Sequence, residues 1–339
     1  MIWMGSTPAA TSLRLARFVL SAAVLFLASV AGHARDAAAA DTAFPGSAVR
    51  LIVPFPPGGP TDTMARIVGA KLQELWSQPV LVEYKPGAGT VIGVDAVAKS
   101  APDGHTMGMV NSAFPINPVY RKSLPYDTLK DLAGVTQLVT IQIVLVANPS
   151  VPFDTVPGLV AYGKRNPGKL SFATPGAGAT SHLAGELLKR AAGIDMVHVP
   201  YKGSAPAQTD LIGGRVDLMF DPFYSALPFV KAGKLKVIAL NGDRRVAGYE
   251  QYPIVAETYP GFNVTAMLGL VVPAATPRPI VDKIQADIAR VLHAPPERKR
   301  IEELGMEIVA STPGEFTAFV RSEMQKWGKV IRETGIEQE

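Results

Sequence analysis

The sequence of 339 residues contains no cysteine. This absence excludes a disulfide, a thiolate metal site and a lipid anchor attached through a cysteine side chain. A secreted protein can fold without disulfides when its chain is long enough to bury a sizeable core. About 300 residues remain after the N-terminal segment described below, which is enough for two lobes.

The sequence also has little excess of either charge. It contains 33 Lys and Arg against 29 Asp and Glu. Without the first 40 residues, which include Arg14, Arg17, Arg35 and Asp36, the balance is 30 against 28. No basic run is longer than Arg298–Arg300. We therefore expect no nucleic-acid partner.

Catalytic and cofactor motifs are missing as well. The five histidines are scattered, with no H-x-x-x-H pair, so no metal site is predicted. No G-x-S-x-G motif occurs, and Ser204 has no evident base near it in the sequence. No glycine-rich segment carries the Lys-Ser or Lys-Thr of a nucleotide-binding P-loop. We predict no catalytic residue, no metal and no cofactor.

Residues 1–40 have the pattern of a secretory signal peptide. Two arginines precede an apolar stretch, Phe18–Ala31, and small residues follow it. The apolar stretch is too short for a comfortable membrane span, which favours cleavage over an uncleaved membrane anchor. Cleavage after Ala40 is favoured over cleavage after Ala34. The sequence therefore predicts a secreted protein.

After this segment, short apolar runs alternate with amphipathic segments along the chain. Val49–Phe55, Lys169–Thr174 and Val216–Asp221 are three of the apolar runs. Such alternation is typical of parallel α/β units, whose helices cover both faces of the sheet. We therefore predict an α/β fold.

Two apolar stretches, Gly134–Pro149 and Phe262–Pro277, are too long for one ordinary strand. We interpret them as strands that cross between two lobes, each with a mainly parallel sheet flanked by helices. A single larger sheet is the alternative. Residues 41–143 and 244–339 then form lobe 1, and residues 144–243 form lobe 2.

Two glycine-rich loops follow the same plan of strand, loop and helix. The loop is Pro-Pro-Gly-Gly in Val49–Trp76 and Pro-Gly-Ala-Gly-Ala in Lys169–Leu188. Each loop opens a helix, whose unpaired N–H groups and positive dipole end favour an anion, and glycine lets a ligand approach the backbone. Thr61 and Thr180 can cap these helices or donate to a ligand. The loops could be tight turns only, but one in each lobe favours a shared ligand.

A third glycine-rich segment, Lys85–Gly93, also lies between a predicted strand and a helix. Its spacing is G-x-G-x-x-x-G, and no acidic residue clearly ends a following strand to hold a ribose. We interpret it as a structural turn rather than a dinucleotide site. Two roles stay open. Asp62 can complement the helix dipole, orient its loop or select against a second negative charge, and His182 is either structural or a ligand contact.

Five segments together carry a family resemblance. They are VRLIVPFPPGGPTDTMAR, VEYKPGAGTVIGVDAVAKSAPDGHTM, LSFATPGAGATSHLAGELL, VPYKGSAPAQTDLIGGRVDLMFD and VKAGKLKVIAL. In this order they resemble the Bug family of periplasmic solute-binding receptors, the TctC-type components of tripartite tricarboxylate transporters. The resemblance runs from about Val49 to Glu339. It implies a two-lobed, type II periplasmic-binding-protein fold and a location in the periplasm.

The resemblance also implies where a carboxylate ligand is held. The family's two anchoring loops match Phe55–Asp62 and Thr174–Thr180, whose backbone groups, with the hydroxyl of Thr180, are implied to bind the carboxylate. This agrees with the argument from helix N-termini. Asn111 and Ser112 stand where many relatives have Gly followed by Thr or Ser, so the contact there departs from the family's pattern.

The segment Phe220–Pro228 is rich in aromatic residues. It hints at a larger or aromatic ligand, with ordinary packing as the alternative, and Asp221, Phe223 and Tyr224 are candidates for contact with the ligand's far end. The predicted ligand-binding residues are Phe55, Pro57, Gly58, Gly59, Thr61, Asp62, Asn111, Ser112, Thr174, Gly176, Ala177, Gly178, Ala179, Thr180, Asp221 and Phe223.

The predicted function is that of a periplasmic receptor, not an enzyme. It captures a small di- or tricarboxylate, aliphatic or aromatic, between its lobes and delivers it to a membrane permease of the tripartite tricarboxylate type. We expect it to be a monomer. The alternatives are an α/β enzyme acting on a small organic acid and a ligand-sensing partner of a membrane signalling protein.

Overall fold

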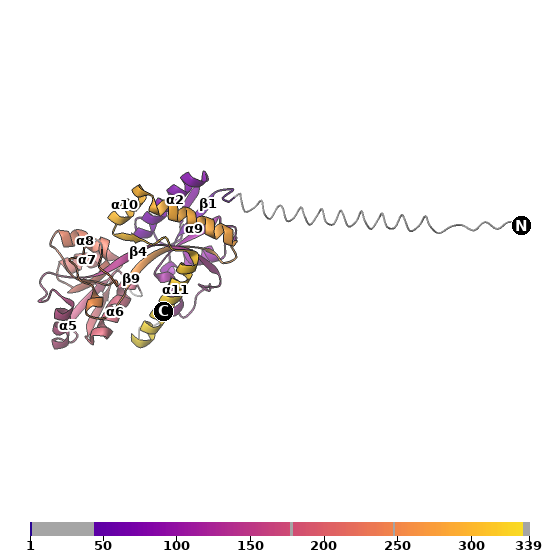
Figure 1. Cartoon of the computed structure of the whole chain (residues 1–339). Coiled ribbons are helices and arrows are strands. Elements are labelled where there is room, and N and C mark those ends of the chain that lie inside the picture. Colours follow the sequence, from indigo (N-terminus) through magenta and orange to yellow (C-terminus); the bar gives the residue numbers. More distant parts are fainter. Residues whose placement is uncertain (2–43, 177–178, 247, 335–339) are drawn as a thin grey trace. The chain divides into compact units, whose positions relative to one another are not determined.

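Figure 1 shows the fold of the chain in a computed structural model. The chain divides into two units, Met1–Gly46 and Ser47–Glu339, and the fold below is that of the second unit. The predicted signal peptide and its cleavage positions lie outside the described residues. No helix in the described part of the chain is long and apolar enough to cross a membrane. The described residues are Met1, 44–176, 179–246 and 248–334.

Ten strands of the described chain form one curled sheet with the order β2-β1-β3-β9-β4-β7-β5-β6, and β8 and β10 each pair with β4. The strands β2, β1 and β3 are parallel, as are β7, β5 and β6, whereas β9 and β4 run antiparallel to their neighbours. The strands are β1 (Val49–Val53), β2 (Val80–Tyr84), β3 (Thr106–Asn111), β4 (Leu132–Ala147), β5 (Leu170–Thr174), β6 (Met196–Pro200), β7 (Leu218–Pro222), β8 (Lys236–Leu240), β9 (Thr265–Pro273) and β10 (Met306–Ile308).

Strand β4 belongs to both halves of this sheet. Residues 132–142 pair with β9, whereas residues 143–147 pair with β7. The chain returns to the first half just before β9, where the N–H of Val264 donates to the carbonyl of Asn241 at 2.6 Å. The two halves are thus parts of one sheet that share β4, and Figure 1 shows β4 and β9 between two groups of helices.

Helices begin and end where the sequence provides the appropriate residues. Pro60 starts α2, since its fixed φ suits a first helical position. Helix α6 ends at Gly193 in the left-handed region, which glycine adopts easily. The helices are α2 (Pro60–Trp76), η1 (Ala88–Thr90), α3 (Val91–Ala98), α4 (Ala113–Tyr120), α5 (Val156–Arg165), α6 (Thr180–Ala192), α7 (Ser204–Ile212), α8 (Phe223–Lys231), η2 (Val255–Glu257), α9 (Arg278–His293), α10 (Pro295–Glu303) and α11 (Pro313–Thr334).

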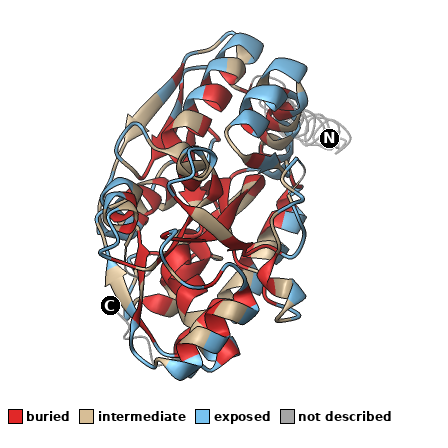
Figure 2. Ribbon diagram, turned by 90° about the vertical axis from the view of Figure 1, so that its left-hand side faces the viewer, coloured by how far each residue is buried: buried red, intermediate tan, exposed pale blue. Residues whose placement is uncertain are grey.

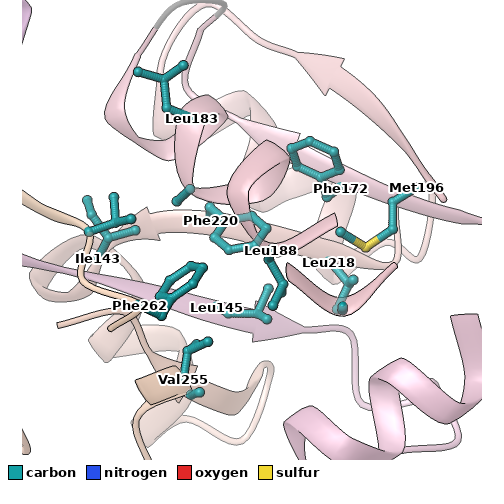
Figure 3. Close-up of a cluster of buried hydrophobic side chains, with 14 of the residues drawn as sticks. Ile143, Leu145, Phe172, Leu183, Leu188, Met196, Leu218, Phe220, Val255 and Phe262 are labelled. Atoms are coloured by element: carbon teal, nitrogen blue, oxygen red, sulfur yellow. The ribbon is translucent and has the colours of Figure 1, made fainter. Parts of the chain in front are cut away.

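The largest apolar cluster joins strands of the second half of the sheet, from residue 143 of β4 onwards, to the helices α4 and α11. Leu145 and Phe172 belong to it, and so do Ile116 and Tyr120 of α4 and the fully buried Trp327 of α11. Figure 3 shows the part of this cluster around Phe172. Figure 2 shows that buried residues gather in the middle of the unit and exposed residues on its outer turns. The C-terminal helix therefore packs into the core where the halves meet.

Candidate functional site

The first predicted loop joins β1 to α2. Strand β1 is almost completely buried, and the chain turns after it with Gly58 at φ +97°, a conformation that favours glycine. Gly59 precedes the helix in an extended conformation, and no side chain in the described part of the chain caps this N-terminus. The N-terminus of α2 therefore has no described side-chain cap, although the carboxylate of Asp62 lies in the first turn of the helix.

Asp62, in the first turn of α2, holds this loop in shape. Its carboxylate accepts hydrogen bonds from the N–H of Gly58 at 2.8 Å and from the hydroxyl of Tyr84 at 2.7 Å, and it pairs with Nε of Arg66 at 2.9 Å. Burial by itself raises the pKa of Asp62, but these hydrogen bonds and the charge of Arg66 outweigh it, so the pKa lies below its usual range. Of the open roles of Asp62, the geometry supports the orientation of the loop.

The second predicted loop joins β5 to α6 in the same way. The hydroxyl of Thr174 donates to the carbonyl of Gly176 at 3.1 Å. The N–H groups of Tyr201 and Gly203 donate to the carbonyls of Thr174 and Pro175 at 3.0 and 2.9 Å, which fastens the loop to the neighbouring chain. Helix α6, like α2, lacks a side-chain cap among the described residues.

Two histidines pack beside this second loop. The rings of His182 and His198 stack with centroids 3.9 Å apart, and Nε2 of His198 lies 2.7 Å from the hydroxyl of Thr174. Burial lowers the pKa of each histidine to about 4, and nearby positive charge, including that of Lys189, adds to the effect. Both rings are therefore neutral near pH 7. His182 belongs to this packing and is absent from the described residues that line the cavity below.

A cavity of about 480 Å³ is lined by residues of both loops. Its wall includes Ile141 and Ile143, where β4 passes from one half of the sheet to the other, and Ala266–Leu268 at the start of β9. The volume is that of a pocket for a small organic molecule. The predicted residues that line this cavity are Phe55, Gly59, Thr61, Asn111, Ser112, Ala179 and Thr180.

The remaining predicted residues are not among the described lining residues. Some of them brace the loops, as the hydrogen bonds of Asp62 and Thr174 show. Ala177 and Gly178 lie outside the described residues. The predicted residues that do not line the cavity are Pro57, Gly58, Asp62, Thr174, Gly176, Asp221 and Phe223.

Asp221 and Phe223 are buried in the protein and are not among the described residues that line the cavity. Asp221 is fully buried and accepts hydrogen bonds from Ser204 at 2.5 Å and from Gln208 at 2.6 Å, and burial raises its pKa to about 6. Phe223 packs in an apolar cluster. Tyr224, the third candidate of this segment, does line the cavity. The aromatic segment thus contributes one ring to the cavity and one to the core.

Other residues of the lining were missed by the sequence analysis. Gly89 and Thr90 come from the third glycine-rich segment, and Asn117, Tyr120 and Arg121 come from α4 and its end. Thr90 has φ +84°, which is rare for a β-branched residue and marks a strained turn. The sequence carried one signal for Gly89 and Thr90: their turn lies between a strand and a helix, as the two predicted loops do.

The side chains that line the cavity are suited to binding a ligand. Its described lining contains hydroxyl and amide groups, such as those of Thr61, Asn117 and Thr180, and one cationic side chain, Arg121. No aspartate, glutamate or histidine is among the described residues that line it. Among the described residues, no three metal-binding side chains come together. Convergent polar groups in a mostly apolar pocket recognise a ligand.

The fold and this cavity define a class: a two-lobed α/β solute-binding protein. The chain belongs to the TctC family, described as the tripartite tricarboxylate transporter family receptor, which it matches over residues 64–336. Family members are periplasmic binding proteins. The predicted family, the two-lobed fold and the role as a receptor rather than an enzyme are confirmed.

The chain is also similar to individual proteins of known sequence or structure. The chain is 36% identical to protein BugT of Bordetella pertussis, covering 87% of this chain and 91% of that one. Among solved structures, the periplasmic binding protein BugD is 32% identical with a TM-score of 0.74, covering 87% and 100% of the two chains. Rpa4515 of R. palustris, solved with adipate, is 29% identical with a TM-score of 0.77, covering 87% and 99%.

Proposed function

We propose that the protein binds the carboxylate of a small organic acid between the N-termini of α2 and α6. The supporting observation is that both glycine loops line one cavity of about 480 Å³. Helix N-termini stabilise an anion through peptide N–H groups and the helix dipole, and these two helices come from opposite halves of the sheet. The adipate bound by Rpa4515 supports an organic acid as the ligand class.

Within this proposal, the loop residues have two kinds of role. Gly59, Thr61 and Thr180 contact the carboxylate, because they line the cavity at the helix N-termini. Asp62 and Thr174 keep the loops in the conformation that exposes those N-termini. The backbone groups of the other predicted loop residues, Gly58, Gly176, Ala177 and Gly178, complete the proposed anchor.

We further propose that the protein is a secreted monomer whose lobes close on the ligand. The lobes are residues 41–143 with 244–339, and residues 144–243. A closure that buries the ligand changes the surface seen by a membrane permease, and this couples binding to delivery. The sharing of β4 by both halves of the sheet supports such a movement, since few chain crossings have to bend.

A thermal-shift screen against mono-, di- and tricarboxylates, aliphatic and aromatic, tests the proposal. A ligand at about a hundred times its dissociation constant stabilises the folded state by roughly 2.7 kcal/mol and should raise the melting temperature. Calorimetric titration then measures its affinity, and chromatography should recover the acid unchanged. The proposal fails if no carboxylate raises the melting temperature or if the bound acid is converted to another compound.

A further inference from the structure

His198 is not among the described residues that line the cavity, but it contacts the chain on both sides of the second loop. It belongs to β6, which runs parallel to β5 and pairs His198 with Phe172. Paired residues of neighbouring strands, and residues two positions apart in one strand, share a face of the sheet. Phe172, Thr174 and His198 therefore present their side chains to the same face of these strands.

The contact before the loop is a hydrogen bond to Thr174, the last residue of β5. Nε2 of His198 lies 2.7 Å from the hydroxyl of this fully buried threonine, which donates to the carbonyl of Gly176 at 3.1 Å. A hydroxyl has one proton to donate, so the proton of the shorter hydrogen bond is carried by Nε2 of His198. The two bonds thus run in one direction, from His198 through Thr174 into the loop, and each polarises the other.

The contact after the loop is a ring stack with His182, in the first turn of α6. The two imidazoles lie 3.9 Å apart with planes 10° from parallel, and His198 also stacks on Phe172 at 4.9 Å. Gly185 lets the helix approach Phe172 closely, since a Cβ atom there would lie 2.3 Å from the phenyl ring. Figure 3 shows the Phe172 ring beside the helix that carries Leu188. His198 therefore helps to seat the start of α6 on β5 and β6.

These contacts bear on the ligand because the proposed carboxylate lies beside the same helix start. Thr180 and Ser181, the first two residues of α6, line the cavity. A helix N-terminus binds an anion through N–H groups whose directions are set by its first turn. When residues behind a site hold that turn in place, binding does not have to order it first.

We propose that His198 is a positioning residue for the carboxylate: through Thr174 and His182 it holds the second loop and the N-terminus of α6 in the geometry that receives the anion. This inference rests on the proposed function, in which the anion lies at that N-terminus. The hydrogen bond to Thr174 is the part that acts on the loop, because it continues to Gly176. Loss of the Nε2 donor should therefore weaken binding although every group that touches the ligand is unchanged.

The variants separate the hydrogen bond from the ring stack. His198→Phe keeps a flat ring but loses the donor, whereas His198→Gln keeps an N–H donor on a side chain without a ring. Thr174→Val removes the hydroxyl, and Thr174→Ser keeps it. Ser171→Ala is the matched control, because Ser171 lies on the same strand but its hydroxyl donates to Asp217 at 2.8 Å and it is not among the described lining residues.

Each variant of the whole purified protein is titrated calorimetrically with hexanedioate, butanedioate, propane-1,2,3-tricarboxylate and benzoate, and its melting temperature is measured without ligand. For a probe that the wild type binds, His198→Phe and Thr174→Val should each lower the affinity about three- to tenfold, as expected for one hydrogen bond. The double variant should bind no more weakly than either single variant, because both changes remove the same bond. His198→Gln and Thr174→Ser should stay within about twofold of the wild type. Ser171→Ala should lower the melting temperature and leave the affinity unchanged.

A spectroscopic readout tests the direction of the hydrogen bond without any ligand. The nitrogen chemical shifts of a neutral imidazole distinguish its two tautomers, and the signals of His198 are those lost in His198→Phe. Burial, with the nearby charge of Lys189, lowers the pKa of His198 to about 4, so the ring is neutral near pH 7. The Nε2–H tautomer should dominate in the wild type and lose this dominance in Thr174→Val.

Failure of this inference differs from failure of the proposed function. The inference is overturned if His198→Phe binds every probe as the wild type does, or if affinity falls only in proportion to melting temperature, Ser171→Ala included. It is also overturned if Nδ1 carries the proton in the wild type. In these cases carboxylate binding itself stands. A wild type that binds none of the four probes overturns the inference too, and the proposed function fails with it if no other carboxylate of the screen binds.

Discussion

Replacement of Asp62 with asparagine should destabilise the first loop by an amount that the structure lets us work out. The carboxylate accepts from Gly58 and Tyr84 and pairs with Arg66, whose side chain is 60% exposed. The exposed pair contributes little. An asparagine keeps one acceptor oxygen but turns an NH₂ donor towards another donor, so about one hydrogen bond to a charged group is lost. The expected loss is about 1.5–3 kcal/mol.

The dependence on pH gives the prediction a second readout. The pKa of Asp62 is below its usual range in the folded protein, because the hydrogen bonds from Tyr84 and Gly58 and the charge of Arg66 outweigh the opposing effect of burial. Ionised Asp62 therefore stabilises the fold above its unfolded pKa of about 3.9, and this stabilisation is lost as the pH falls through the folded pKa. The difference between wild type and Asp62→Asn should be constant from about pH 5 to 8 and shrink below about pH 4.

Urea unfolding followed by circular dichroism measures both effects. Asp282→Asn is the matched control: Asp282 also pairs with an arginine four residues away, but its side chain is 51% exposed and braces no glycine loop. Its substitution should cost less than about 0.5 kcal/mol. Equal losses in the two variants, or a difference for Asp62→Asn that does not change with pH, would refute the assignment of Asp62 to the loop.

Further substitutions test the rest of the site. Gly59→Val should abolish most ligand binding without loss of stability. Gly59 has an extended backbone, and apart from its chain neighbours no described atom lies within 4 Å of its Cβ position. Gly314→Val is the control in the calorimetric titration, because the space around Gly314 is equally open. Thr180→Val should weaken binding by about 1.5–3 kcal/mol at unchanged melting temperature, and normal binding would remove this hydroxyl from the site. The wild type should lose stability as the pH falls from about 6.5 towards 4, because the folded protein holds His182 and His198 neutral, and urea midpoints of His182→Gln should fall less steeply over this range.

The elements and the two glycine loops could be predicted because their signals are local. The run Val49–Val53 is apolar and mostly β-branched, and Pro-Pro-Gly-Gly followed by a periodic apolar face marks the end of the strand and the start of the helix. The length of Gly134–Pro149 likewise predicted the strand that became β4. None of these inferences needed contacts between distant parts of the chain.

The end of β7 shows where such reasoning stops. Phe223 and Tyr224 are the first two residues of α8, directly after β7, and neighbouring side chains of a helix point about 100° apart. Both faces of β7 are buried, and apolar residues occupy both odd and even positions in and around the strand. Without the start of α8 fixed in advance, the sequence offered no means of choosing between Phe223, which entered the core, and Tyr224, which reached the cavity.

Arg121 could not be found from local sequence for a deeper reason. In the sequence it is one of two adjacent basic residues after a short helix, and its neighbour Lys122 is exposed. In the fold its Nε donates to Asn117 at 3.3 Å, and Asn117 donates to the carbonyl of Gly89, which lies 28 residues from Asn117 in the chain. The two glycine loops and the arginine that line the same cavity are thus separate in sequence.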